Sequence, residues 1–320
     1  MICGTDARFR YEVTADQQRR ALAALYEDPA VLAIGMADYR MFRCQACELE
    51  FANPPTPGSQ QFYDWIVAHE AYYPTDRWEW SQVRQIVQSL AAGRSEPLTL
   101  IDVGCGAGDF LNVLRDVPNV RGIGLDFTAD SVKACRDRGI EAYCTDLQHA
   151  RDSIAGVIDV VTAFHCLEHV PDPLGFICQA RDLLGPGGRL LISTPYSPMS
   201  FEGTWFDPLN HPPHHLTRWK SEPYRALAAR AGMQVMLMPG PARSLPKRTL
   251  GAFLLQAGLG PSASLRRTPA AVFFAALRHP IMLLGQILRQ ARRQRVDGLP
   301  APDVIMAEFT ALPASASRRE

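Results

Sequence analysis

Short apolar runs alternate with amphipathic segments along most of the chain. Seven runs have the length and the branched-residue content of a buried strand: 98–103, 120–126, 140–144, 158–164, the segment after Pro186-Gly187-Gly188, 233–238 and 303–309. Segments with helical character lie before or between them, among them 81–92, 129–138 and 221–231. This alternation predicts an α/β fold with a doubly wound sheet and helices on both faces.

The first of these runs ends in a glycine-rich turn. It reads Asp102-Val103-Gly104-Cys105-Gly106-Ala107-Gly108, and a helix is expected to begin at Asp109. A strand, a glycine loop and a helix in this order predict a nucleotide-type site at the carboxyl end of the strand. A dinucleotide fingerprint needs glycines at G-x-G-x-x-G, but position 109 is Asp. The Asp102 carboxylate would repel a pyrophosphate and would suit a positively charged ligand.

This stretch resembles motif I of the class I S-adenosylmethionine-dependent methyltransferases. Leu167-Glu168-His169-Val170 after the fourth run resembles the motif that follows strand four in small-molecule methyltransferases. The matching segments follow the family order from residue 98 to residue 195. The resemblance implies a Rossmann-like, seven-stranded methyltransferase sheet, in which 303–309 inserts as an antiparallel seventh strand.

The resemblance also implies a set of cofactor-binding residues. Asp126 ends the second strand 20 residues after Gly106, where a carboxylate can accept hydrogen bonds from ribose hydroxyls. Asp146 takes the position that faces the adenine amine in the family. The full set expected to bind S-adenosylmethionine is Asp102, Gly104, Cys105, Gly106, Gly108, Asp126, Phe127, Asp146, Leu147 and His165.

Histidines gather in the loops after the fourth and fifth strands. Five of the eight histidines fall between residues 165 and 215. If the methyl acceptor is a hydroxyl, a histidine is suited to take its proton near neutral pH. The candidates are His165, His169, His214 and His215. In the resembling ubiquinone-type O-methyltransferases, acids of this loop and its histidine bind a divalent metal; His165 stands here at the first acid position.

Residues 1–50 form a small module with its own candidate chemistry. Cys3 stands near the start and Cys44-Gln45-Ala46-Cys47 follows some 40 residues later. A C-x-x-C pair has the spacing of a tetrahedral zinc site, and some methyltransferases carry an N-terminal zinc ribbon with two such pairs. The metal ligands would be Cys3, Cys44 and Cys47, with His69 an optional fourth; the alternative is unrelated free thiols. Thr14 is expected to cap a helix that ends near Asp28.

Residues 51–97 join this module to the core. A Pro-rich turn is followed by a dense aromatic segment and then by the helix at 81–92. The aromatic side chains can simply pack between the module and the core. Alternatively, Tyr72 and Tyr73 line the entrance to the substrate site, because this segment precedes the first strand.

The net charge of zero conceals a strong asymmetry. Residues 1–222 carry 19 basic and 29 acidic residues, whereas 223–296 carry 12 basic residues and no acidic one. Most of this basic segment lies in 241–302, an insertion between strands six and seven. From Pro280 onwards, Ile281, Leu284 and Leu288 recur on one helical face beside arginines. Such a helix can lie on an anionic membrane surface or form an ordinary lid or dimer surface. No recognition motif for nucleic acid accompanies the charge.

The sequence therefore predicts a methyltransferase domain over 98–240 and 303–314 with two additions, a zinc-ribbon-like module and a basic helical insertion. We expect methylation, most readily of an oxygen atom, on a small-molecule or glycan acceptor that can be lipid-linked. The alternatives are a sugar C-methyltransferase and a membrane-associated scaffold that binds the cofactor without turnover; an NAD-dependent oxidoreductase ranks behind these. Cysteines at core positions, and the lack of a signal peptide or long apolar run, predict a cytoplasmic protein, peripheral at the inner membrane face if the insertion binds lipid.

Overall fold

The computed structural model describes residues 2–69, 77–259, 269–292, 295–296, 299–300 and 302–312. Tyr72 and Tyr73, proposed above to line a substrate entrance, lie outside the described residues.

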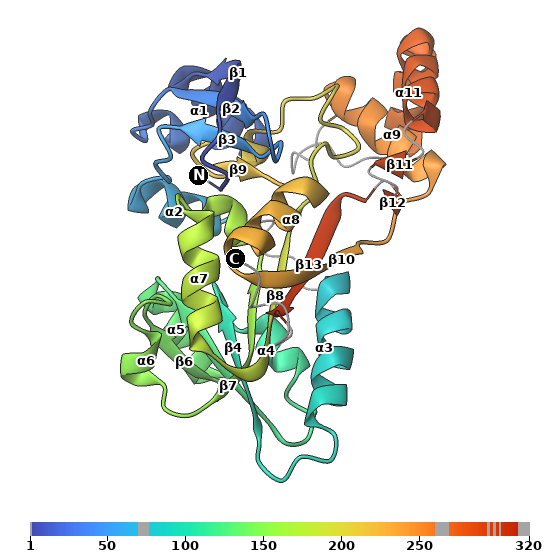
Figure 1. The fold of residues 1–320 in the computed structure, drawn as a ribbon. Helices are drawn as coiled ribbons and strands as arrows, with labels where there is room; N and C mark the ends of the chain where they lie inside the picture. Colours follow the sequence, from blue (N-terminus) through green and yellow to red (C-terminus); the bar gives the residue numbers. More distant parts are fainter. Residues whose placement is uncertain are drawn as a thin grey trace.

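A seven-stranded sheet forms the centre of the molecule (Figure 1). The strand order is β10-β13-β8-β7-β4-β5-β6. β13 is antiparallel to both β8 and β10, and the remaining pairs are parallel. The bounds are β4 (Leu98–Val103), β5 (Val120–Asp126), β6 (Glu141–Cys144), β7 (Ile158–Phe164), β8 (Leu184–Pro195), β10 (Met233–Pro239) and β13 (Val304–Ala311). The expected fold class and antiparallel seventh strand are confirmed.

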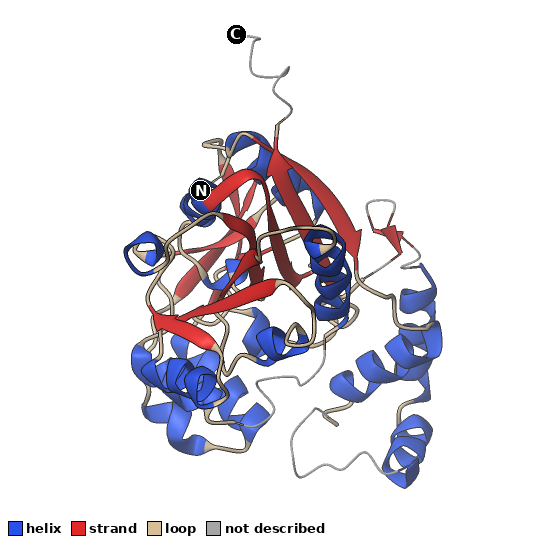
Figure 2. Ribbon diagram, turned by 90° about the horizontal axis from the view of Figure 1, so that it is seen from below, coloured by secondary structure: helices blue, strands red, loops and turns tan. Residues whose placement is uncertain are grey.

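Helices cover both faces of this sheet (Figure 2). One apolar core joins α3 (Trp78–Ala91), α4 (Asp109–Val113) and α5 (Ala129–Asp137) to Leu98 and Leu100 of β4. The second core joins α7 (Pro173–Leu183) and α8 (Ser221–Arg230) to Ile101 and Val103. Because β4 is buried on both faces, its sequence is apolar apart from the partly buried Thr99 near its start and Asp102, where it reaches the site.

The N-terminal module lies over the carboxyl edge of the large sheet (Figure 1). It contains β1 (Ala7–Val13), α1 (Ala15–Tyr26), η1 (Pro29–Ala33), β2 (Tyr39–Cys44) and β3 (Glu50–Asn53), and α2 (Gln60–Val67) follows it. The Thr14 hydroxyl caps α1 by accepting the Gln17 amide at 3.2 Å, as expected. A fourth strand, β9 (Thr217–Arg218), comes from the loop after β8 and pairs with β3. The module is thus built partly from the domain that carries the large sheet, which ties it to the carboxyl edge of that sheet.

Short helices shape the remaining loops of the core. α6 (Ala150–Ser153) precedes β7, η3 (Leu167–His169) follows it, and η4 (Pro208–Asn210) lies in the loop after β8. The Leu216 amide donates to the Glu168 carbonyl at 2.8 Å and joins the last two loops.

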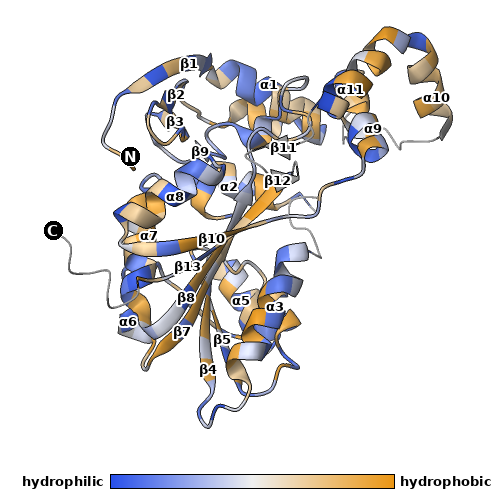
Figure 3. Cartoon of the chain, turned by 45° about the vertical axis from the view of Figure 1, so that its right-hand side comes forward, coloured by the Kyte–Doolittle hydropathy of each residue, from blue (hydrophilic) through white to orange (hydrophobic). Residues whose placement is uncertain are grey.

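The insertion forms three helices at the side of the molecule: α9 (Leu245–Gln256), α10 (Pro269–Arg278) and α11 (Pro280–Arg292). Two short strands, β11 (Arg295–Val296) and β12 (Leu299–Pro300), lie between α11 and β13. In α11 the apolar face points outward, because Ile281 and Leu284 are 85% and 56% exposed while Gln286 and Gln290 are buried. Figure 3 shows apolar residues along the projecting helices. No single helix among the described residues has the length and hydropathy of a membrane span; α10 and α11, bent by 96°, meet that test only as a pair.

Candidate functional site

The glycine loop after β4 turns its amide groups inward. Gly104, Gly106 and Gly108 all have positive φ, between 53° and 80°, which explains why glycine occupies these positions. The amides of Gly104 and Cys105 donate to the Leu125 carbonyl, and the Gly108 amide donates to the Cys105 carbonyl. The loop therefore does not offer these amides to a pyrophosphate, which argues against a dinucleotide.

Asp102 lies at the inner end of this loop. Its side chain is only 3% exposed and accepts a hydrogen bond from the Thr162 hydroxyl at 2.7 Å. Burial raises the pKa of Asp102 to about 7, with a smaller contribution from the Asp126 charge. A buried carboxylate of this kind gains most from a cationic ligand, which replaces the hydration that the charge has lost.

Asp126, at the end of β5, organises the loop and keeps room for a ligand. Its Oδ2 accepts the Gly106 amide at 3.0 Å, and its Oδ1 accepts the amide and hydroxyl of Thr128 at 2.9 and 2.8 Å. A carboxylate has about four acceptor positions, so one remains for a ribose hydroxyl. This geometry fits the predicted role.

The other predicted cofactor residues differ in how accessible their side chains are to a ligand. Phe127 is 77% exposed beside Asp126, so its ring is accessible to a ligand. Asp146 Oδ1 accepts the His149 amide at 2.9 Å and contacts the His149 ring at 2.7 Å. Leu147 is buried in the core, and only its backbone could face adenine.

Cys105 does not present its thiol to the loop. Its sulfur lies 3.8 Å from that of Cys135, and a Cβ on Gly124 would come within 2.6 Å of it. The side chain therefore fills the core beneath the loop, and the expectation that Cys105 binds the cofactor does not extend to its thiol.

His165 is held between two buried carboxylates. Its Nε2 lies 2.9 Å from Glu79 Oε1, and its Nδ1 lies 3.4 Å from Glu168 Oε1. Its φ of 53° is uncommon for a residue with a side chain. Burial alone would lower the pKa of His165, but the two carboxylates outweigh burial and raise it. An imidazole already paired in this way is less suited to take a proton from an acceptor.

The remaining three candidate bases form one group, the histidine cluster of His169, His214 and His215. Their ring centroids lie 4.5 to 4.9 Å apart. Burial and the neighbouring histidines hold the pKa of His214 and of His215 well below the usual value. These two rings are therefore neutral at physiological pH.

The loop that contributes His169 to the cluster contacts the glycine loop. The loop that carries His169 also carries Cys166, whose thiol donates to the Val103 carbonyl at 3.2 Å. A Cβ on Gly104 would come within 2.5 Å of that sulfur. The two loops therefore meet at the carboxyl edge of β4 and β7, where open α/β sheets bind their ligands.

A polar cavity of about 360 Å³ opens between the N-terminal sheet and the loop after β8. Arg218, whose side chain is 9% exposed, lies 3.4 Å from Glu202 and stacks 5.8 Å over the Tyr11 ring. Asn210 joins the cavity to the cluster, donating to Glu202 at 2.6 Å and contacting His215 Nδ1 at 3.1 Å. The cavity is lined by Tyr11, Glu202, Gly203, Thr204, Trp205, Phe206, Asp207, His211 and Arg218.

A larger cavity of about 470 Å³ lies between the end of α3 and residues 117–119. These segments precede β4 and β5, so this cavity is at the amino edge of the sheet, away from the glycine loop.

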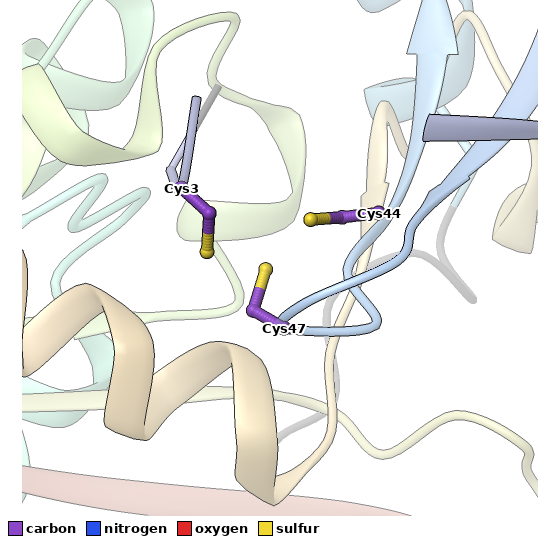
Figure 4. A group of neighbouring side chains, drawn as sticks. All are labelled: Cys3, Cys44 and Cys47. Atoms are coloured by element: carbon purple, nitrogen blue, oxygen red, sulfur yellow. The ribbon is translucent and has the colours of Figure 1, made fainter. Parts of the chain in front are cut away.

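The three cysteines of the N-terminal module converge as predicted. The thiols of Cys3, Cys44 and Cys47 point toward one another (Figure 4) and lie within 4.8 Å of one another. Burial raises the pKa of Cys44, but hydrogen bonds from the Cys47 and Ala46 amides and from Thr5 outweigh burial and lower it to about 7. At Cys44 the thiolate, which is the metal-binding form, is thus more accessible, whereas burial and the two neighbouring thiols raise the pKa of Cys47 to about 12.

His69 is not part of this group. Its Nδ1 lies 2.9 Å from the Trp65 carbonyl and its Nε2 lies 3.6 Å from Asp28. The suggestion that His69 is a fourth metal ligand is therefore wrong: aromatic packing with Tyr26 and Trp65 holds the ring elsewhere.

Comparison with known proteins identifies the family. A family model described as a methyltransferase domain matches residues 75–237, half of the chain. The chain belongs to the methyltransferase domain family. Together with the strand order, this confirms the expected enzyme class, a class I methyltransferase.

Relatives of this methyltransferase include two enzymes named ubiquinone biosynthesis O-methyltransferase. The one from Erwinia tasmaniensis is 37% identical over 103 residues, and the one from Idiomarina loihiensis is 34% identical over 104 residues. Each match spans 30% of this chain and 41% of the relative. Among solved structures, a SAM-dependent methyltransferase from Archaeoglobus fulgidus has a TM-score of 0.46 and 16% identity, over 72% of this chain and 94% of that one.

Three residues of the methyltransferase site were not identified from the sequence. Glu79 lies in the first turn of α3, where an acidic residue is common and carries no special signal. Asn210 and Arg218 flank His214 and His215 in sequence, and the available clue is that four ionisable or amide side chains surround these two histidines between residues 207 and 218.

Proposed function

We propose that this methyltransferase transfers the methyl group of S-adenosylmethionine to a hydroxyl group of a small molecule or glycan. The observation that carries the proposal is the meeting of Asp102, the inward-turned glycine loop and the histidine cluster at one edge of the sheet. Each would serve a different part of the reaction. Asp102 would attract the positive charge of the cofactor, the glycine loop would position the cofactor, and the histidine cluster would act on the proton of the acceptor hydroxyl.

The chain's residues fit this cofactor. When bound, S-adenosylmethionine supplies an electrophilic methyl group on a sulfonium that is already a good leaving group. Asp102 would attract its positively charged end, and Asp126 would accept a ribose hydroxyl. Because the leaving group is already in place, alignment of the acceptor is the main task of the protein.

The polar cavity is the proposed acceptor site. Its volume lies within the range of about 300–1,000 Å³ usual for small-ligand pockets. The Tyr11 ring and the Glu202 and Arg218 side chains could stack on and hydrogen-bond a hydroxylated ring. The link through Asn210 would bring that ring's hydroxyl toward the histidine cluster.

Oxygen is the favoured methyl acceptor because the matched relatives are named O-methyltransferases. His169, the least buried imidazole of the cluster, can take the proton that a hydroxyl loses on methylation. Methylation of a sugar carbon, and cofactor binding without turnover, are the competing proposals.

Incubation with ¹³C-methyl-labelled S-adenosylmethionine separates these three proposals. The purified protein is added to soluble and lipid-extractable cell fractions, and the product is examined by NMR. A resonance of an oxygen-bound methyl supports the proposal, a carbon-bound methyl supports C-methylation, and binding without any label transfer supports the scaffold. An Asp126→Ala variant is the control for enzyme-dependent labelling.

We also propose a structural zinc ion at Cys3, Cys44 and Cys47. The supporting observation is the convergence of three thiols, one with a lowered pKa. The site lies beside the core residues that join the module to the large sheet. A metal there would hold the module in place, and with it Tyr11, which the N-terminal sheet contributes to the lining of the polar cavity.

A third proposal concerns the insertion, whose α10 and α11 would dock on an anionic membrane surface at the cytoplasmic side. Supporting it is the inverted burial of α11, together with exposed Phe273 and Phe274 on α10. Arg278 and Arg292 border these apolar side chains, and 223–296 carries no acidic residue. Apolar side chains flanked by arginines complement acyl chains beneath anionic headgroups.

A further inference from the structure

The histidine cluster has the arrangement of a metal site. One ring nitrogen from each of His169, His214 and His215 lies within 4.8 Å of one from each of the others. The ligands come from two loops, because His169 follows β7 while His214 and His215 follow β8. From this convergence we infer that the three histidines bind a divalent transition-metal ion.

Hydrogen bonds at Nδ1 orient all three rings. His169 Nδ1 donates to the His214 carbonyl at 2.6 Å, and His214 Nδ1 donates to the Leu209 carbonyl at 2.8 Å. His215 Nδ1 donates to the Asn210 side-chain oxygen at 3.1 Å. Each bond places the ring proton on Nδ1 and the lone pair on Nε2. Metal-binding histidines are typically oriented by such bonds from their second nitrogen.

Glu168 provides a second, independent observation. Its side chain is 1% exposed, and among the residues that the structure describes neither carboxylate oxygen has a hydrogen-bond partner. Its Oε1 lies 3.9 Å from His215 Nε2 and 3.4 Å from His165 Nδ1. His165 balances part of this buried charge from one side. Because a buried carboxylate is costly unless it is fully compensated, a cation held by the adjacent histidines would stabilise it further.

The donor set selects the class of metal. Three imidazoles with a nearby carboxylate suit Zn²⁺, Fe²⁺, Co²⁺ or Ni²⁺, whereas Mg²⁺ prefers oxygen ligands. This set differs from the acid-rich loop of the ubiquinone-type enzymes, because two of its three ligands come from the loop after β8. If the proposed function holds, a metal there would lower the pKa of the acceptor hydroxyl, and the histidines would act as ligands rather than as the base.

Cobalt loading of the full-length protein distinguishes this site from the cysteine cluster. After chelation, Co²⁺ is added and the metal content and absorption spectrum are measured. Thiolate ligands give intense near-ultraviolet charge-transfer bands, whereas imidazole ligands give only the weaker visible bands. We expect two metal ions per chain in the wild type. His214→Ala combined with His215→Ala should remove one ion and leave the charge-transfer band, and His279→Ala, which lies outside the cluster, should retain both.

A milder variant tests the site if the double alanine variant does not fold. Asn210→Leu should weaken metal binding at the histidines about 10-fold, the usual effect of losing such an orienting bond. The inference is overturned if the wild type binds only thiolate-ligated metal, or if the histidine and Asn210 variants leave metal binding unchanged. S-adenosylmethionine binding, measured separately, would reveal failure of the proposed function without affecting the metal count.

Discussion

Nε2 of His165 lies 2.9 Å from Oε1 of Glu79, a carboxylate that stands 86 residues earlier in the chain. This contact joins the first turn of α3 to the loop after β7. It holds His165 against the site in a backbone conformation that would otherwise be unfavourable. The helix that precedes the first core strand is thus part of the site's support.

Replacing the Glu79 carboxylate should lower the free energy of unfolding by an amount that depends on pH. Burial raises the pKa of Glu79, but the hydrogen bond and charge of His165, together with the Arg77 charge, outweigh burial and lower the pKa. The two carboxylates in turn raise the pKa of His165. The contribution of the Glu79 charge to the free energy of unfolding is complete above its unfolded pKa of about 4.3 and is lost as the pH falls further. The contribution of the His165 charge is complete below its unfolded pKa of about 6.5 and is lost as the pH rises through its raised folded pKa. The loss of unfolding free energy in Glu79→Gln should therefore be largest near pH 5.5, where both groups are charged, at roughly 3 kcal/mol.

Urea denaturation from about pH 4 to pH 9 measures this cost, with the exposed Glu96→Gln as the matched control. A loss that is the same at every pH would show that Glu79 acts by packing alone.

Gly104 should tolerate alanine less well than a glycine with the same backbone conformation. Gly104 and Gly93 have φ of +70° and +73°. A Cβ on Gly104 would lie 2.5 Å from the Cys166 sulfur, whereas a Cβ on Gly93 would have no atom of the described residues within 4 Å. Gly93→Ala should lower the free energy of unfolding by about 1 kcal/mol, because of the positive φ alone. Gly104→Ala should lower it by about 1–3 kcal/mol more, because the added methyl group overpacks the site. Thermal unfolding of both variants measures the difference. Adding Cys166→Ala should recover the packing part; equal costs at the two glycines would contradict the predicted clash.

Loss of the cysteine site should be visible in metal content and stability together. Cys44→Ser should remove one zinc ion per chain, lower the melting temperature and abolish the thiolate–cobalt band, because metal affinity and folding are coupled in such sites. Cys178→Ser, on α7, should keep the metal. An unchanged zinc content in Cys44→Ser would reject the site.

Membrane docking should depend on the outward face of α11. Ile281→Glu with Leu284→Glu should reduce sedimentation with anionic vesicles by at least about 10-fold, since both the apolar contact and the charge match are lost. Leu32→Glu, at an exposed apolar position of the N-terminal module, should bind as the wild type does. Binding that persists in the double variant, or that is equal for neutral vesicles, would argue against this surface.

The large sheet could be predicted because its strands are buried on both faces and read as apolar runs. Asp102 and Asp126 were identifiable for a similar reason: each is a polar residue at the end of such a run. The Glu79–His165 contact could not be predicted, because nothing local links two residues separated by 86 positions.

For the insertion, the sequence predicts a helix but not which of its faces is buried. The period of Ile281, Leu284 and Leu288 indicates an amphipathic helix but not which face is buried. In the structure Gln290 donates to the Ser200 carbonyl at 2.7 Å and Gln286 to Gln256 at 2.6 Å, so tertiary hydrogen bonds place the polar face inward. α9 was missed altogether, because its apolar residues continue the Pro- and Arg-rich segment before it without a clear period.

Calorimetric titration with S-adenosylmethionine tests the central claim most directly. Because burial raises the pKa of Asp102 to about 7, a cationic ligand should bind more weakly below that pH, by about 10-fold between pH 8 and pH 6. The wild type should bind one molecule per chain with this pH dependence and should not bind NADH, and Asp102→Asn should bind weakly at every pH. No binding of S-adenosylmethionine at any pH, or binding of NADH in its place, would contradict the assignment of this loop as a methyl-donor site.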